Sequence, residues 1–168
     1  SEVKPDILLL LGDRTDILAA AVASLPLLIP VAHIHGGESS EGAIDEHIRH
    51  AVTKLSHIHF TATEFYARRL MQLGEEEWRI HVSGAPGIEH IYKTNLPDPD
   101  EINKSLGINV FKPLLMMTYH PETLNPTNTL EHIQHILDAI RSTKLPVVIT
   151  YPNSDMGGRL IIENINKF

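Results

Sequence analysis

The chain has 168 residues, of which 42% are hydrophobic and 21% charged, so it can bury the core of one domain or parts of two. The absence of cysteine excludes disulfides and thiolate chemistry, and a formal net charge of −7 argues against a nucleic-acid surface. Ser24, Pro26 and Pro30 interrupt the longest apolar run, so no membrane span is expected. We expect a cytoplasmic protein whose partner is a small molecule, with no nucleic acid and no membrane.

Short apolar runs alternate with amphipathic stretches through the first half of the chain, which is typical of parallel α/β domains. The first helix would be capped by Thr15 or Asp16, and the third would begin behind Thr63 and end at Gly74. The predicted strands are Ile7–Leu11, Leu25–Ala32, His57–Ala62 and Arg79–Val82, and the helices between them are Ile17–Ser24, Ile44–Leu55 and Glu64–Leu73.

The second half begins with a proline- and acid-rich stretch, Asn95–Asp100, which we interpret as a surface linker. The elements predicted after it are a helix at Glu101–Leu106, a strand at Leu114–Thr118, a helix at Leu130–Ile140, a strand at Val147–Thr150 and a helix opened by Gly157 and Gly158. The chain starts directly at a strand and stops inside a helix. We therefore expect a segment of a larger protein, with residues 1–95 in one α/β domain and 96–168 as the linker and start of another.

Polar clusters follow the predicted strands, on the side where α/β sheets bind ligands. Asp13 follows four leucines and a glycine, so it is either a partly shielded general acid or base, or a helix cap. Asp45 and Arg49 are four residues apart on one helix face. Arg49 can orient Asp45 or bind a phosphate there, and the alternative is an ordinary surface ion pair.

Histidines and paired glycines define the other candidates. His33, His35, Glu38 and His47 are possible metal ligands, but their spacing matches no established metal signature, so no metal is predicted. His120 stands at a strand end and can act as an acid, a base or a phosphate donor, or it simply bonds a neighbouring loop. The pair Gly36-Gly37 either lets the backbone approach a ligand or makes a tight turn.

Together these motifs resemble the UDP-N-acetylglucosamine 2-epimerase family, most closely the hydrolysing branch that makes N-acetylmannosamine for sialic acid synthesis. The resemblance covers nearly the whole chain in the order of the family. It is carried by Gly12-Asp13-Arg14, HIHGGESSEGAIDEHIRHAVTKLSHIHFTATE (33–64), SGAPGIEHI (83–91), TYHPET (118–123) and YPNSDMGG (151–158).

The resemblance implies two Rossmann-like domains of the GT-B type, of which this chain is a central part, and an enzyme that forms homo-oligomers and needs no cofactor. It implies removal of the C2 proton of a UDP-linked N-acetyl sugar, expulsion of UDP, and hydration with inversion at C2. Many members have glutamate at the place of His35, so either His35 or Glu38 takes that role, or the substrate differs. The implied catalytic residues are Asp13, His35, Glu38, Asp45, Arg49 and His120, and the implied substrate-binding residues are Arg14, Gly36, Gly37, Asn153 and Asp155.

Three other functions stay open on the sequence alone. A non-hydrolysing epimerase would keep UDP on the sugar. An inactive fragment would bind a nucleotide sugar without turning it over. A metal-dependent hydrolase would use His33, His35 and Glu38.

Overall fold

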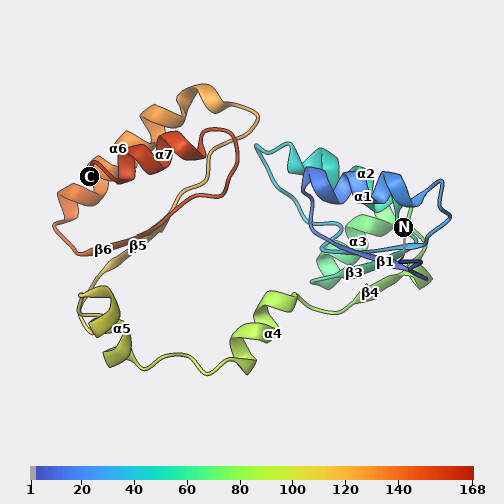
Figure 1. Cartoon of the computed structure of the whole chain (residues 1–168), viewed down its shortest axis with the longest axis horizontal. Coiled ribbons are helices and arrows are strands. Elements are labelled where there is room, and N and C mark those ends of the chain that lie inside the picture. Colours follow the sequence, from blue (N-terminus) through green and yellow to red (C-terminus); the bar gives the residue numbers. More distant parts are fainter. Residues whose placement is uncertain (1–2) are drawn as a thin grey trace. The chain divides into compact units, whose positions relative to one another are not determined.

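The computed structural model describes residues 3–168, which divide into a first unit ending at Thr94 and a second unit from Asn95 to Phe168 (Figure 1). Both units contain a parallel sheet and helices, so the predicted α/β class is confirmed. Among the described residues, no helix combines the length and apolar character that crossing a bilayer requires.

The first unit is a parallel sheet in the order β1-β2-β3-β4. Because consecutive strands lie side by side and run the same way, the carboxyl ends of all of them meet at one edge. The strands are β1 (Leu8–Leu11), β2 (Val31–Ile34), β3 (Ile58–Thr61) and β4 (Ile80–Val82), the last preceded by the 3-10 turn η1 (Glu77–Arg79). The helices are α1 (Thr15–Ser24), α2 (Asp45–Leu55), α3 (Glu64–Gln72) and α4 (Pro86–Lys93).

Alternation along β1 decides which face of this sheet forms the core. Leu8 and Leu10 pack with residues of α1 and α2, including the fully buried Val52. Leu9 and Leu11 point to the other face and are 59% and 51% exposed. Removing a side chain of this size from water stabilises the fold by roughly 1.5–3 kcal/mol, so the helix-covered face contributes most of the stability of β1.

The second unit is a smaller parallel pair of strands covered by helices. Ile133, Leu137 and Ile161 form its core, and Met117 and Ile149 of the strands pack against them. Its elements are α5 (Pro99–Leu106), β5 (Leu115–Thr118), η2 (Pro126–Asn128), α6 (Thr129–Thr143), β6 (Val147–Thr150) and α7 (Gly158–Ile165). The glycine that precedes α7 has a positive φ of 95°, which a residue with a Cβ rarely adopts.

The second predicted strand, Leu25–Ala32, is wrong in position. The chain instead turns through Leu25 to Leu28 after α1, with Leu28 at φ 55° and 90% exposed, and β2 begins only at Val31. Pro26 and Pro30 have no N–H for a strand ladder, which favours the turn. Because β2 runs from Val31 to Ile34, His33 lies inside this strand and not after it.

Helix ends were predicted with mixed success. Thr63 caps α3 as expected, because its Oγ1 accepts a hydrogen bond from the Tyr66 N–H at 3.3 Å. The predicted caps of α1 are wrong: Arg14 occupies the N-cap position, and neither Thr15 nor Asp16 precedes the helix.

The region between the two units contains more helix than predicted. Helix α4 was not foreseen. Helix α5 begins at Pro99, inside the stretch interpreted as linker, because Asp98 and Glu101 form a reciprocal capping box at its start. The Asp98-Pro99 pair, which predicted a loop, is therefore also the N-cap and first residue of a helix.

Candidate functional site

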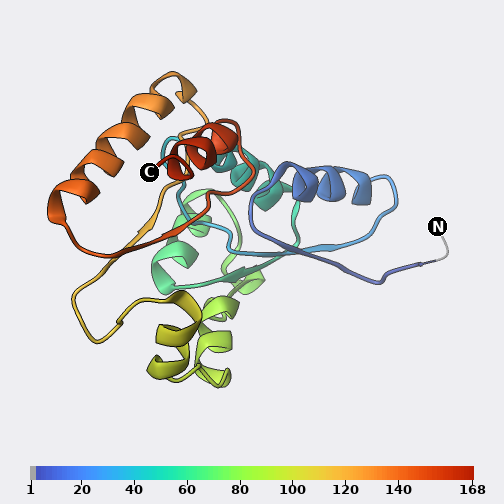
Figure 2. The same cartoon turned by 60° about the vertical axis from the view of Figure 1, so that its left-hand side comes forward.

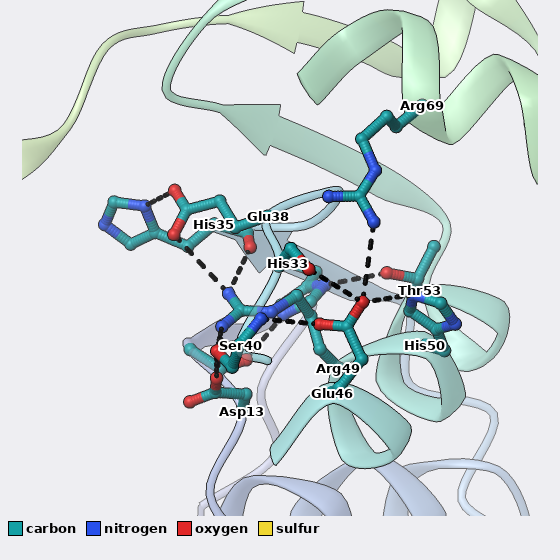
Figure 3. A network of polar contacts seen from close by, with 12 residues as sticks. Asp13, His33, His35, Glu38, Ser40, Glu46, Arg49, His50, Thr53 and Arg69 are labelled. Carbon is teal, nitrogen blue, oxygen red and sulfur yellow. Dashed lines mark hydrogen bonds and ion pairs between the residues drawn. The ribbon is translucent and has the colours of Figure 1, made fainter. Parts of the chain in front are cut away.

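A network of polar side chains occupies the carboxyl edge of the sheet in the first unit (Figure 3). Asp13 comes from the loop after β1, and the loop after β2 supplies His35, Glu38 and Ser40. The network is completed by Arg49 from α2. The parallel strands bring these loops together because Leu11 of β1 is paired with Ile34 of β2, immediately before them.

Arg49 is the centre of this network although only 5% of it is exposed. One terminal nitrogen donates to the backbone oxygen of His35 at 2.8 Å and lies 3.5 Å from Glu38 Oε2. The other donates to a carboxylate oxygen of Asp13 and, at 2.8 Å, to Ser40 Oγ. A planar guanidinium can hold several acceptors in fixed directions, so Arg49 sets the positions of both carboxylates.

The expected pairing of Asp45 with Arg49 is wrong. Arg49 instead pairs with Asp13 and Glu38. Within the part of the chain that the structure describes, no ion pair joins Asp45 to Arg49. Asp45 is the first residue of α2 and is partly exposed, so its charge lies at the positive end of the helix dipole.

His35 is held in a strained backbone conformation next to Glu38. Its φ is 70°, a region that residues other than glycine rarely enter and that costs on the order of 1–2 kcal/mol. Its N–H donates to the Phe60 oxygen at 3.0 Å, while Arg49 binds its carbonyl. Its side-chain Nδ1 lies 2.5 Å from Glu38 Oε1. The imidazole is therefore oriented by a carboxylate that Arg49 in turn holds.

The glycine pair after His35 is explained by packing against α3. A Cβ on Gly37, whose φ is 81°, would lie 2.4 Å from the Tyr66 backbone oxygen. A Cβ on Gly36 would lie 3.2 Å from His33 Nδ1 and 3.5 Å from Leu70 Cδ1. The geometry supports the tight-turn interpretation, and a direct contact of these glycines with a ligand stays a prediction.

His33 is a core residue of β2. Its ring is fully buried, and Nε2 donates to the Gly12 backbone oxygen at 2.7 Å. Burial lowers the pKa of His33 to about 4, against the opposing effect of the Gly12 oxygen, so the ring is neutral near pH 7. The described residues contain no group of three or more histidine, aspartate or glutamate side chains placed to hold a metal ion.

Sequence reasoning missed Glu46, which ties the loop after β2 to two helices. Its carboxylate accepts the Ser40 N–H at 2.8 Å and lies 3.4 Å from Arg69 of α3 and from His50. Burial raises the pKa of Glu46, but the Ser40 N–H, His50 and further donors outweigh burial and lower it overall. The serine pair ahead of an acidic first helical turn was the available signal, since such residues bond across helix starts.

A pocket of about 800 Å³ opens at the same edge, beside the ends of β3 and β4. The SGAPG motif supplies part of its wall through Ser83 and Gly84, and Thr63 and Tyr92 supply others. The motif thus lies at the carboxyl edge of the sheet, where the position of the polar clusters after the strands predicted it.

The second unit gathers its predicted residues at the carboxyl ends of β5 and β6. The Asn153 N–H donates to His120 Nδ1 at 3.1 Å, so a neutral His120 ring carries its proton on Nε2. The Asn153 side-chain amide donates to Asp155 at 2.6 Å. His120 and Asn153 are exposed to solvent, while Arg14 belongs to the first unit, at the start of α1.

Comparison with known proteins identifies the family. Residues 1–168 match the family described as UDP-N-acetylglucosamine 2-epimerase. The chain belongs to this family. The resemblance of its motifs is therefore confirmed, and so is the Rossmann-like fold of the GT-B-type epimerases.

Two relatives and one solved structure show the extent of the match. The chain is 43% identical over 98% of its length to a hydrolysing UDP-N,N'-diacetylbacillosamine 2-epimerase of Legionella pneumophila. It is 39% identical to a hydrolysing GDP/UDP-N,N'-diacetylbacillosamine 2-epimerase of Campylobacter jejuni over 99% of its length. The Neisseria meningitidis UDP-GlcNAc 2-epimerase bound to UDP-GlcNAc superposes with a TM-score of 0.73 at 22% identity, over 99% of this chain. The chain spans 43%, 44% and 47% of these three proteins, respectively.

Proposed function

We propose that the protein to which this chain belongs is a hydrolysing 2-epimerase of a UDP-linked N-acetylated sugar. The observation that carries the proposal lies at the carboxyl edge of the sheet. There Arg49 forms ion pairs with Asp13 and Glu38, and Glu38 is hydrogen-bonded to His35. Acid and base groups held in this way at a ligand-binding edge suit proton transfer at a carbon. The two relatives described above, both named hydrolysing 2-epimerases, support the same reaction.

The proposed reaction moves one proton and one leaving group. A base takes the hydrogen from C2 of the sugar, and the C2–H electron pair becomes a C1–C2 double bond as the C1–O bond to UDP breaks. Water then adds its hydroxyl to C1 and a proton to the opposite face of C2, which releases the 2-epimer and UDP. The departing diphosphate needs cationic or N–H donors, and in the first unit we assign Arg14, at the start of α1, to it.

The substrate is the finer part of the proposal. Because the relatives described above act on UDP-N,N'-diacetylbacillosamine by name, this sugar nucleotide is the first to test. UDP-N-acetylglucosamine is the second, since a protein of Neisseria meningitidis named UDP-N-acetylglucosamine 2-epimerase is 33% identical to the chain. The two sugars share the C2 acetamido group and the diphosphate, so both fit the chemistry above. We propose a cytoplasmic enzyme that works as a homo-oligomer.

The test is product analysis in heavy-oxygen water with the full-length protein and each sugar nucleotide. We expect free UDP and a 2-epimerised free sugar with the heavy oxygen on C1. A UDP-linked epimer that accumulates would instead indicate the non-hydrolysing reaction. A rise in melting temperature with UDP but no product from either sugar would indicate a binding protein. Arg141→Gln, which removes an exposed ion pair of α6 with Asp138, is the matched control and should leave turnover unchanged.

A further inference from the structure

We propose that His35 is the base that takes the C2 proton, that its Nε2 is the accepting atom, and that Glu38 is the residue that positions it. This assignment rests on the proposed function. The departure of this chain from the glutamate found in many members left His35, Glu38 and a different substrate as alternatives. The contacts around the network decide between the first two.

Glu38 determines which nitrogen of His35 can accept a proton. A carboxylate only accepts hydrogen bonds, so the 2.5 Å contact requires that Nδ1 carry the hydrogen and donate it to Glu38 Oε1. The neutral ring then has its lone pair on Nε2. In the part of the chain that the structure describes, Nε2 has no hydrogen-bond partner, and the His35 side chain is 21% exposed. Figure 3 shows the ring on the far side of Glu38 from Arg49, at the outer end of the network.

The other basic groups of the network are already engaged. Asp13 is paired with Arg49 and also accepts from Ser40 Oγ at 3.4 Å. Glu38 has Oε1 on His35 and Oε2 within 3.5 Å of Arg49. Both carboxylates therefore have an oxygen occupied by the Arg49 guanidinium, which fixes their positions. The Nε2 of His35, by contrast, has no partner among the described residues, and Arg49 binds the backbone oxygen of His35 rather than its ring.

Proton uptake by His35 keeps the contact between its Nδ1 and Glu38. Arg49 is one cation between the carboxylates of Asp13 and Glu38, so the group carries net negative charge while His35 is neutral. A proton on Nε2 makes an imidazolium whose Nδ1–H is already bonded to Glu38, and the charges of the group then balance. The same carboxylate–imidazole arrangement orients and stabilises the base in hydrolase triads.

The backbone at His35 supports a role for the direction of its side chain. A non-glycine residue at φ 70° persists only where its surroundings hold it, and here Phe60 and Arg49 bind its N–H and carbonyl. The bonds and electrons of the step balance as follows. Nε2 accepts the C2 hydrogen as a proton, the C2–H pair forms the C1–C2 double bond, and the C1–O pair leaves with the diphosphate. Inversion requires the new C2–H bond on the opposite face, so the proton on His35 passes to solvent.

The experiment uses His35→Gly and His35→Asn in the full-length protein. Glycine adopts a positive φ without strain and leaves a space for added imidazole, whereas asparagine tolerates this φ and removes the basic nitrogen. We expect both variants to lower kcat by roughly 10²–10⁴-fold with little change in KM. Added imidazole should restore UDP release by His35→Gly but not by the double variant that also carries Glu38→Gln. Exchange of the C2 hydrogen with deuterated water should fall and recover in parallel.

Each outcome decides one question. If the wild-type protein is active and His35→Asn or His35→Gly keeps kcat within about threefold, the assignment of the base is wrong while the proposed function stands. Loss of activity in both variants with no imidazole rescue and normal UDP binding also overturns the assignment. If Glu38→Gln has no effect on kcat or on rescue, Glu38 does not position the ring. If the wild-type protein releases no UDP from either sugar nucleotide, the proposed function fails and the assignment fails with it.

Discussion

Arg49 of α2 binds the carboxylate of Asp13, which lies 36 positions earlier in the chain. This ion pair joins the loop after β1 to the helix after β2 and places both groups beside His35 and Glu38. One buried guanidinium therefore organises two strand ends, and the properties of the site should depend on it more than on any other side chain.

Replacing Arg49 by methionine should reduce both stability and activity. It would leave Asp13 and Glu38 without their cation, and the loss of one partner from a buried ion pair costs about 3–5 kcal/mol. Urea unfolding measures the stability, and Arg49→Lys should recover only part of it because an ammonium cannot reproduce the forked contacts. A change below about 1 kcal/mol in Arg49→Met would show that the network is not a stabilising element.

Two glycines, one in the turn after β2 and one after β4, offer a matched pair of substitutions. Gly37 and Gly84 both have a φ of 81°, but a Cβ on Gly37 would meet the Tyr66 oxygen at 2.4 Å, whereas a Cβ on Gly84 meets nothing within 4 Å. Gly84→Ala should therefore cost only the backbone strain of about 1–2 kcal/mol. Gly37→Ala should cost clearly more, as thermal unfolding would show. Equal losses in the two variants would contradict the packing explanation of the glycine pair.

His33 should make stability depend on pH. Its pKa falls from 6.5 in the unfolded chain to about 4 in the folded protein, so between these values the unfolded chain binds more protons. Neutral His33 therefore makes its full contribution to the free energy of unfolding above pH 6.5. That contribution is lost as the pH falls toward 4, and the total loss is about 3 kcal/mol.

The measurement for this prediction is urea unfolding at several pH values with His33→Gln. The variant should show a smaller loss of stability between pH 6.5 and 4 than the wild-type protein does. Part of the dependence should remain, because burial also lowers the pKa of His59. The control is His135→Gln on the exposed face of α6, which should leave the dependence as it is. An unchanged pH dependence in His33→Gln would exclude His33 as its source.

A second ionic cluster, around Glu75, should matter for stability and not for the reaction. The Glu75 carboxylate lies 2.6 Å from Lys54, 3.1 Å from His59 and 3.4 Å from Arg79, and only 5% of its side chain is exposed. Glu75→Gln removes the charge that these groups share and should cost about 1–3 kcal/mol. Turnover below the unfolding temperature should stay at the wild-type level. A loss of kcat without a loss of stability would place this cluster in the catalytic machinery.

Much of the fold could be predicted from local pattern. The runs near Ile7 and Val147 and the amphipathic stretch with Ile48 and Val52 have the periodicity of strands and helices, and these elements form where expected. Predictions failed where two local signals compete. The apolar run around Leu28 predicts a strand, but its prolines favour a turn. The composition around Asp98 predicts a linker, but Asp98 caps a helix there.

The sequence by itself determined the family, the α/β class and the set of residues at the strand ends, because motif order and hydrophobic period are properties of the chain alone. Only the tertiary structure decided which side chains of the site contact one another. Asp45 is four residues from Arg49, yet Arg49 pairs with Asp13, since parallel strands place distant loops at one edge. The same packing decided that Gly36 and Gly37 fit against α3 and that Glu38 holds the ring of His35. Such relations depend on the register of the sheet and on crowding in the core, which no spacing along the chain specifies.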